Sequence, residues 1–143
     1  MVFSHLVEIP PTFNELEDES TSQGFALLAR LRSEWDNRVN RFDRDGEILL
    51  GAYRGERLVG IGGLNRDPYL ADGVTGRIRH LYVLEAERRA GIGRALVERL
   101  LQHAVTHFDV VRLWTDHAQS FYESLGFLRV EAPKATHVLR IRD

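Results

Sequence analysis

The apolar residues of this 143-residue chain are spaced as in strands in some stretches and as in helices in others. Residues 3–9 have the length and apolar content of a first strand, which Pro10-Pro11 would end because proline lacks a backbone N–H group. An apolar stripe from Phe25 to Trp35 has helical spacing and predicts a helix over about residues 22–38. The acidic piece at residues 14–20 could form a short helix or a loop.

The middle of the chain has the pattern of a β-hairpin. Residues 47–53 and 57–64 would be its strands, and Gly55 in the turn between them can take a positive φ. The second strand contains Gly60, Gly62 and Gly63. These glycines indicate a bulge or a place where another group approaches the backbone closely, and the alternative is a tightly packed sheet edge. Residues 65–76 are the longest loop candidate.

The most strand-like run is at residues 77–84, where alternation would place Ile78, His80, Tyr82 and Leu84 on one face. The best amphipathic helix follows at about residues 91–107, and a short apolar strand comes after it at residues 110–115. A strand, a helix and a strand in this order make a βαβ unit with a right-handed crossover. The pattern therefore predicts a parallel strand pair.

The end of the chain predicts a short helix and a closing hairpin. Thr115 or Asp116 could cap the helix, and Gly126 would end it. Residues 128–131 and 137–141 would then pair through a turn at residues 132–134.

The composition is that of one globular domain, which we expect to span residues 1–143. Apolar residues are 43%, charged residues are 28% and the formal net charge is −2, so nothing indicates a nucleic-acid partner. Cysteine is absent, which excludes disulfides and thiolate metal ligands, and the spacing of the histidines predicts no metal site. No run resembles a signal peptide or a membrane span, so a cytoplasmic protein with no membrane partner is expected.

A candidate anion site lies between the strand at residues 77–84 and the following helix. Its sequence is Arg88-Arg89-Ala90-Gly91-Ile92-Gly93-Arg94. The glycines let the backbone turn tightly, and the first turn of the helix offers N–H groups without partners together with the positive end of the helix dipole. A ligand with phosphate groups is therefore expected, although a strand, a glycine turn and a helix also make an ordinary structural corner.

Two segments together resemble the GCN5-related N-acetyltransferase superfamily. The first is Leu81-Tyr82-Val83 followed by Arg88-x-x-Gly91-x-Gly93-Arg94, and the second is Ala118-x-x-x-Tyr122-Glu123-x-x-Gly126-Phe127. The resemblance implies an α/β (α+β) fold in which a central mixed sheet is flanked by helices and two splayed parallel strands form the acyl-coenzyme A site. It also implies transfer of an acyl group, most simply acetyl, to a primary amine by direct attack in a ternary complex.

The resemblance assigns acetyl-coenzyme A as the co-substrate and places it along the first segment. The residues implied in binding it are Leu81, Tyr82, Val83, Arg88, Arg89, Ala90, Gly91, Ile92, Gly93 and Arg94. Backbone N–H groups and arginines suit a pyrophosphate, and the amides of the pantetheine arm suit the backbone of a strand.

The resemblance makes Tyr122 the general acid, since a phenol can return a proton to a thiolate. The base does not match, because Arg77 stands where many members have a glutamate and arginine cannot accept a proton. His80 is a tentative replacement, with Asp116, His117 or ordered water as alternatives.

The amine acceptor is not identified by the sequence, and a small molecule or a peptide is equally compatible. Candidates for its site are the early helix and the variable loop, which contribute Trp35, Arg38, Asn65, Arg66, Asp67 and Tyr69. The oligomeric state is also open, with a homodimer as one possibility. The missing glutamate leaves a second hypothesis, a non-catalytic module that binds or senses coenzyme A.

Overall fold

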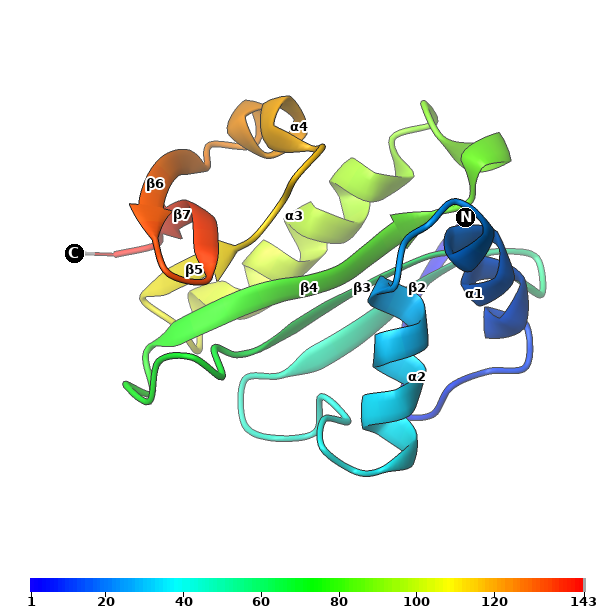
Figure 1. The fold of residues 1–143 in the computed structure, drawn as a ribbon, viewed down its shortest axis with the longest axis horizontal. Helices are drawn as coiled ribbons and strands as arrows, with labels where there is room; N and C mark the ends of the chain where they lie inside the picture. The colour runs from blue at the N-terminus through cyan, green and yellow to red at the C-terminus, as the bar shows by residue number, and fades with distance from the viewer. Residues whose placement is uncertain (143) are drawn as a thin grey trace.

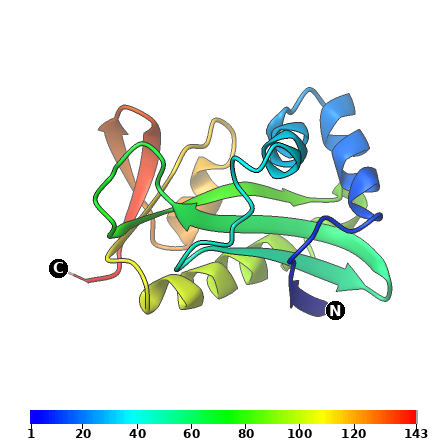
Figure 2. The same cartoon turned by 90° about the horizontal axis from the view of Figure 1, so that it is seen from below.

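A computed structural model describes residues 1–142, which build one seven-stranded sheet with helices on both faces (Figures 1 and 2). The elements are β1 (Val2–His5), α1 (Phe13–Ser22), α2 (Leu27–Asp36), β2 (Ile48–Arg54), β3 (Arg57–Arg66), β4 (Thr75–Val83), a 3₁₀ turn (Glu85–Glu87), α3 (Ile92–Val105), β5 (Val110–Leu113), α4 (Gln119–Ser124), β6 (Leu128–Ala132) and β7 (Ala135–Arg140). The strand order is β1-β2-β3-β4-β5-β7-β6, and β4 with β5 is the parallel pair. The predicted mixed sheet and βαβ unit are confirmed.

Helix α3 covers one face of the sheet, and α1 and α2 lie on the other (Figure 2). The glycines of β3 allow α3 to pack closely, because a Cβ added at Gly60 would lie 3.1 Å from Ile92 Cγ2 and 3.2 Å from Leu96 Cδ1. Burying side chains such as these stabilises the fold by roughly 1.5–3 kcal/mol each. Since β3 lies between β2 and β4, the alternative of a sheet edge was wrong.

The helix predicted over about residues 22–38 is observed as α2, which starts only at Leu27, so its predicted start was wrong. The acidic piece at residues 14–20, predicted as a short helix or a loop, forms α1, and a break separates the two helices. The N–H of Phe25 donates to Ser20 O at 2.9 Å and that of Gly24 to Thr21 O at 3.0 Å, the bonding pattern of a Schellman motif. Gly24 has a φ of 86°, which glycine adopts without strain. Phe25 consequently lies outside the helices and is 39% exposed.

The ends of several elements differ from the prediction. Strand β1 stops at His5, earlier than the proline pair, and α3 starts and ends one or two residues inside its predicted bounds. The β2–β3 and β6–β7 hairpins are confirmed, with Gly55 at a φ of 63°. The N-cap of α4 is Ala118 and no side chain caps the helix, so the predicted capping by Thr115 or Asp116 was wrong. Thr115 Oγ1 instead accepts a hydrogen bond from the N–H of Ala118, just before the helix.

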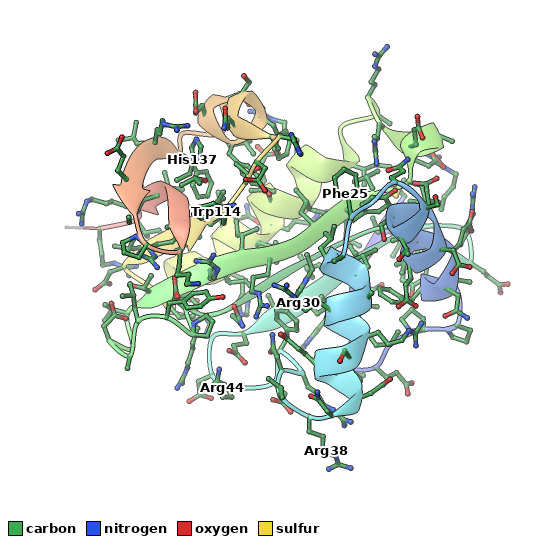
Figure 3. All side chains as sticks on the ribbon, viewed as in Figure 1. Phe25, Arg30, Arg38, Arg44, Trp114 and His137 are labelled. Carbon is green, nitrogen blue, oxygen red and sulfur yellow. The ribbon has the colours of Figure 1, made fainter. Side chains whose placement is uncertain are left out.

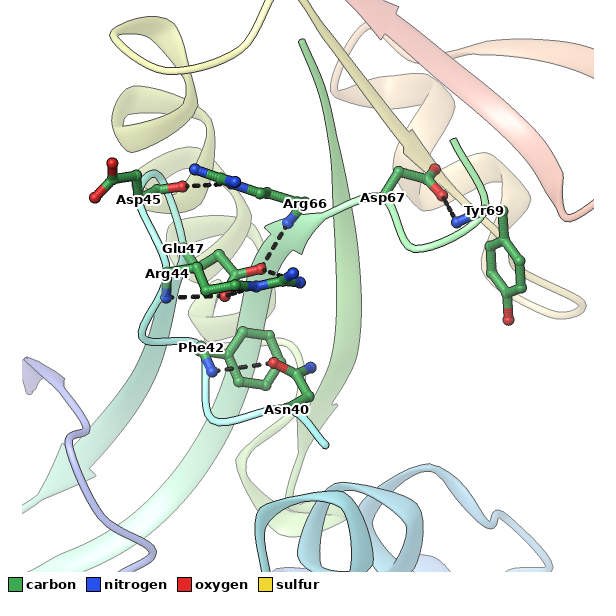
Figure 4. A network of polar contacts seen from close by, with 8 residues as sticks. All are labelled: Asn40, Phe42, Arg44, Asp45, Glu47, Arg66, Asp67 and Tyr69. Atoms are coloured by element: carbon green, nitrogen blue, oxygen red, sulfur yellow. Dashed lines mark hydrogen bonds and ion pairs between the residues drawn. The ribbon is translucent and has the colours of Figure 1, made fainter. Parts of the chain in front are cut away.

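A polar network ties the end of β3 to the turn before β2 (Figure 4). The buried Glu47 accepts hydrogen bonds from the backbone N–H groups of Arg44 and Arg66, at 3.1 and 2.9 Å. Arg66 also donates from Nε to Asp45 O. These bonds fix the point where the chain leaves β3 and hence the position of Asp67, the next residue.

A bulge interrupts β4 in the middle. Ile61 of β3 pairs with Tyr82 and Leu64 pairs with Ile78, so three steps along β3 correspond to four along β4. His80 lies in this stretch with a φ of 62°. Ile61 and Leu64 are three residues apart on β3 and point to opposite faces, so their partners Tyr82 and Ile78 also lie on opposite faces. The predicted common face was therefore wrong.

Candidate active site

The parallel strands β4 and β5 separate within the sheet. They pair over three positions, the last being Arg77 opposite Arg112. Beyond that point β4 runs on to Val83, whereas β5 ends at Leu113 and the chain turns toward α4 (Figure 1). The edge of β4 that faces β5 therefore has backbone groups outside the β4–β5 ladder. This is the predicted splay.

A glycine turn leads from β4 into α3. Gly91 has a φ of 78° and Arg89 a φ of 71°, both in the left-handed region. A Cβ added at Gly91 would meet nothing within 4 Å, so the backbone conformation, not space, favours glycine there. The first turn of α3 begins at Ile92, and its leading N–H groups have no partner within the helix. We call residues 88–94 the cradle.

The arginines of the cradle are exposed and differ in their partners. Arg88 donates from Nε to Val83 O at 3.0 Å, and its guanidinium lies 5.2 Å from the ring centroid of Tyr82. Arg94 Nε lies 3.8 Å from Glu98 Oε2, one helical turn further along α3. Arg89 and Ala90 are exposed as well. The cradle is thus a positively charged, open turn.

The side chains of Leu81 and Tyr82, at the end of β4, contact other parts of the protein. Backbone groups of this segment are therefore what a ligand could bind. Tyr82 Oη donates to Glu19 Oε2 at 2.5 Å, and Glu19 also accepts from the N–H of Glu85. Burial and the carboxylate of Glu19 raise the pKa of Tyr82. Leu81 packs near Gly62 on the α3 face. This predicted cofactor segment is therefore held rigidly between α1 and α3.

Helix α4 places Tyr122 close to the cradle. A Cβ added at Gly93 would lie 3.7 Å from both Phe121 Cζ and Val83 Cγ2, so α4, β4 and the cradle meet there. The Tyr122 ring packs against Phe121 and Phe127, with centroids 5.0 and 5.6 Å away. Burial raises the pKa of Tyr122, which keeps its hydroxyl protonated. Within residues 1–142 this hydroxyl has no hydrogen-bond partner.

The other side of α4 is anchored to the C-terminal hairpin. The fully buried His137 bonds through Nε2 to Glu123 Oε2 at 2.8 Å and through Nδ1 to Thr136 Oγ1 at 2.9 Å. Thr136 Oγ1 in turn accepts from the N–H of Thr115. This chain of contacts holds α4 in place and so orients Tyr122.

A cavity of about 580 Å³ lies beside the bulge of β4. Its lining comes from five separate segments: Gly24, Phe25, Ala26, Leu27, Arg30, Tyr69, Arg77, Ile78, Arg79, His80, Trp114, Asp116 and Lys134. Figure 3 shows Trp114 on the β5 side of β4, with Phe25 and Arg30 on the side of α2. The cavity thus adjoins the same strand that carries the predicted cofactor segment.

His80 presents a neutral imidazole to this cavity. Burial lowers its pKa to about 3, and the positive charges of Arg79 and Arg30 act in the same direction, while a backbone hydrogen bond at Leu27 opposes them. Its Nε2 is buried and has no hydrogen-bond partner among the described residues. Such a nitrogen can accept a hydrogen bond from a ligand, although it is a weak base.

Arg77 is held at the cavity by an ion pair. Its Nη1 lies 3.5 Å from Asp67 Oδ2, and the same oxygen accepts from Arg112 Nε at 2.9 Å. Asp67 is fully buried and also accepts from the N–H of Tyr69 (Figure 4). The Tyr69 ring stacks on Arg77, whose guanidinium lies 4.9 Å from the ring centroid.

The acceptor residues expected from the sequence are only partly brought together. Tyr69 lines the cavity, and Asp67 lies directly behind it. Asp116, predicted as an alternative base, also lines the cavity. Trp35 and Asn65 are buried in the core, and Arg38 lines a different hollow. His117 is outside the lining, with its ring 6.4 Å from that of Phe25.

Several cavity residues were missed by sequence reasoning, namely Phe25, Arg30, Arg79, Trp114 and Lys134. They belong to segments that approach one another only in the folded chain. The exposure of Phe25, an apolar residue, could have pointed to the cavity, but only the structure shows it.

The described residues contain no group of three or more histidine or acidic side chains that could hold a metal ion. None of the helices in residues 1–142 is long and apolar enough to cross a membrane.

The splayed parallel pair with a glycine cradle at its end matches the arrangement that the sequence resemblance implies, and comparisons with known proteins agree. The model of the acetyltransferase (GNAT) family matches residues 10–127. The chain belongs to this family. A solved structure from Exiguobacterium sp. 255-15, assigned as an acetyltransferase, is 31% identical with a TM-score of 0.89, over 97% of this chain and 92% of that one.

More distant structures share the fold. An aminoglycoside 6′-N-acetyltransferase complexed with coenzyme A is 17% identical, with a TM-score of 0.73 over 100% of this chain and 98% of the other. N-acetylglutamate synthase from Neisseria gonorrhoeae, complexed with coenzyme A and N-acetyl-glutamate, is 16% identical, with a TM-score of 0.74 over 100% of this chain and 36% of the synthase. None of the curated proteins compared with the chain is a match.

Proposed function

We propose that this enzyme transfers an acyl group, most simply acetyl, from acyl-coenzyme A to a primary amine that attacks directly while both substrates are bound. The observation that carries the proposal is the opening beyond Arg77 and Arg112, where the free edge of β4 has the cradle at its end and the cavity beside it. Tyr122 lies against the same corner, through the contact of Phe121 with Gly93.

The residues of the cradle fit coenzyme A. The leading N–H groups of α3, at Ile92, Gly93 and Arg94, and the open space at Gly91 suit a pyrophosphate. Arg88 and Arg89 add positive charge. The backbone of Leu81, Tyr82 and Val83 lies beyond the β4–β5 ladder and suits the amides of the pantetheine arm, and two structures of the same fold hold coenzyme A.

The chemistry that the bound co-substrate supplies is an activated thioester. In this proposal Tyr122 is the general acid, because its unpartnered hydroxyl is kept protonated by burial and can give its proton to the leaving sulfur. A backbone N–H near Tyr82 or Val83 would stabilise the oxyanion.

His80 is the proposed proton acceptor for the attacking amine. Its neutral Nε2 has no other partner among residues 1–142, so it can orient the amine through a hydrogen bond. Its low pKa makes proton uptake costly, and Asp116 at the cavity is the alternative base. Replacing His80 and Asp116 in turn distinguishes them, because loss of the residue that acts as the base lowers kcat and shifts the pH profile of kcat.

The first test measures thiol release from acetyl-coenzyme A across a broad panel of primary amines. An amine-dependent release is expected, together with a rise in Tm on addition of acetyl-coenzyme A. A rise in Tm with no transfer to any amine would favour a non-catalytic module that binds or senses coenzyme A. Absence of both effects would contradict either function.

A further inference from the structure

We infer that the acceptor carries a carboxylate in addition to its amine, and that Arg77 and Lys134 bind this carboxylate beside Tyr69. The inference names the substrate class of the proposed acyl transfer and therefore rests on it. It follows from the charge of the cavity lining, which is positive, whereas the formal net charge of the whole chain is negative.

The cavity collects positive charge in a chain whose formal net charge is −2. Four cationic side chains line it, from Arg30, Arg77, Arg79 and Lys134, against the single carboxylate of Asp116. The ion-pair partners behind the lining do not restore balance. Asp67 is shared by Arg77 and Arg112, and Glu34 lies 3.4 Å from Arg79. Cationic groups therefore outnumber carboxylates even when these pairs are included.

The buried carboxylate of Asp67 cannot neutralise both of its arginines. Arg77 and Arg112 share its Oδ2, and Arg112 Nη2 is buried without a hydrogen-bond partner in the described chain. Desolvation lowers the pKa of Arg77, and the charge of Arg112 adds to this effect. An arriving anion would relieve this unbalanced charge. Because Asp67 and Tyr69 hold the guanidinium in place, little side-chain entropy remains to be lost on binding.

Lys134 adds a second cationic group beside Tyr69. Its Nζ lies 5.4 Å from the centroid of the same Tyr69 ring on which Arg77 stacks. It is the one lysine of the sequence and has a φ of 71° in the β6–β7 turn, where a glycine would be less strained. Nitrogen donors from Arg77 and Lys134 near one ring suit a planar carboxylate.

The remaining polar groups suit the amine of the same molecule. His80 Nε2 is a free acceptor, and the exposed Asp116 is the one carboxylate of the lining. Arg77 and His80 are three residues apart on β4, which is roughly 10 Å along a regular strand, and the bulge at His80 shortens this path. Amino acids and short peptides with a free carboxylate carry both groups that the lining can bind, whereas polycationic amines would meet repulsion from the lining.

The experiment compares each acceptor with its amide, for example β-alanine with β-alaninamide and α-amino acids with α-amino amides. The kcat/KM for the acid is expected to exceed that for the amide at least tenfold. Lys134→Met should reduce this ratio several-fold. Arg129→Met is the matched control, since it removes a positive charge from the same hairpin outside the cavity and should keep the ratio. Arg77→Lys provides a second variant that retains the charge beside Asp67.

Binding is measured separately, by tryptophan fluorescence during titration with the acids and amides in the presence of coenzyme A; Trp114 lines the cavity, whereas Trp35 is buried in the core. Turnover of acids and amides at equal kcat/KM would overturn the inference and leave the proposed function intact. Binding of acids that Lys134→Met weakens, without transfer to any amine, would support the anion site and contradict the transfer. Neither turnover nor binding of acids would overturn both.

Discussion

The two sides of the β4 opening are built in different ways. The cradle is a continuous run, residues 88–94, and offers backbone N–H groups at the start of α3. The cavity is assembled from five segments, and charged side chains such as Arg77, Lys134 and Asp116 give it its character. One side thus depends on backbone conformation and the other on side-chain identity.

This difference indicates where specificity resides. A ligand held by backbone N–H groups requires a particular φ at a few glycines and is insensitive to most side chains around it. A ligand held by side-chain charge changes when one arginine or lysine changes. We therefore expect substitutions in the cradle to alter affinity for the donor, and substitutions in the cavity to alter the choice of acceptor.

Tyr122 lies where the two sides meet, and its loss should have the largest effect. Tyr122→Phe removes the proposed proton donor while keeping the ring packed between Phe121 and Phe127. Where chemistry limits turnover, kcat should fall by about a hundredfold or more, with affinity for coenzyme A nearly unchanged. Steady-state kinetics and calorimetric binding measure the two quantities. Tyr53→Phe on β2 is the control, and an unchanged kcat in Tyr122→Phe would remove Tyr122 from the acid role.

The cavity side depends on the charge of Asp67. Asp67→Asn leaves Arg77 and Arg112 buried without their carboxylate, which should lower the free energy of unfolding by about 3 kcal/mol. Urea unfolding measures this loss. Glu15→Gln breaks an ion pair with Arg57 in which both side chains are about half exposed, so no measurable loss is expected. Equal losses in both variants would show that the cavity pair is as well solvated as the surface pair.

The cradle side depends on a single backbone angle. Gly91→Ala forces an alanine toward a φ of 78°, and Gly55→Ala does the same at 63° in the β2–β3 turn. In both places an added Cβ meets nothing within 4 Å, so each should cost about 1 kcal/mol of stability. Only Gly91→Ala should weaken binding of acetyl-coenzyme A, by about tenfold, in a calorimetric titration. Unchanged affinity would mean that the N–H groups of the cradle do not bind the donor.

The contrast between the two sides also explains what the sequence could predict. The cradle, α3 and the parallel pair depend on local patterns, and each was identified at nearly its observed bounds. The break at Gly24 was missed because the apolar stripe near Phe25 continues the helical spacing, although Phe25 is exposed in the structure. The bulge at His80 was missed because a histidine in a strand pattern carries no sign of a positive φ.

The cavity shows the limit more clearly. In the sequence, Arg77 is recognisable only as an arginine at the position where a base was expected. Its ion-pair partners Asp67 and Arg112 are apparent only in the structure, where β3, β4 and β5 lie side by side. Lys134 and Trp114 come from segments that no local pattern connects. Contacts between residues that are distant in the sequence form such a site, and no local pattern in a single sequence predicts them.

The smallest expected effect concerns the positive environment of His80, which is central to the acceptor side. Its pKa of about 3 in the folded protein lies below the ordinary value near 6.5, so the unfolded chain takes up a proton first as the pH falls. Stability from the neutral imidazole is present above pH 6.5 and is lost toward pH 3. Between pH 6.5 and 5.5 the loss should be about 1 kcal/mol.

His80→Asn tolerates the left-handed conformation and cannot titrate, so it should lack this component while keeping that of the other five histidines. Urea unfolding of both proteins at several pH values measures the difference. Parallel pH dependences would mean that His80 can be protonated in the folded cavity, and the cavity would then be less positive than its lining indicates.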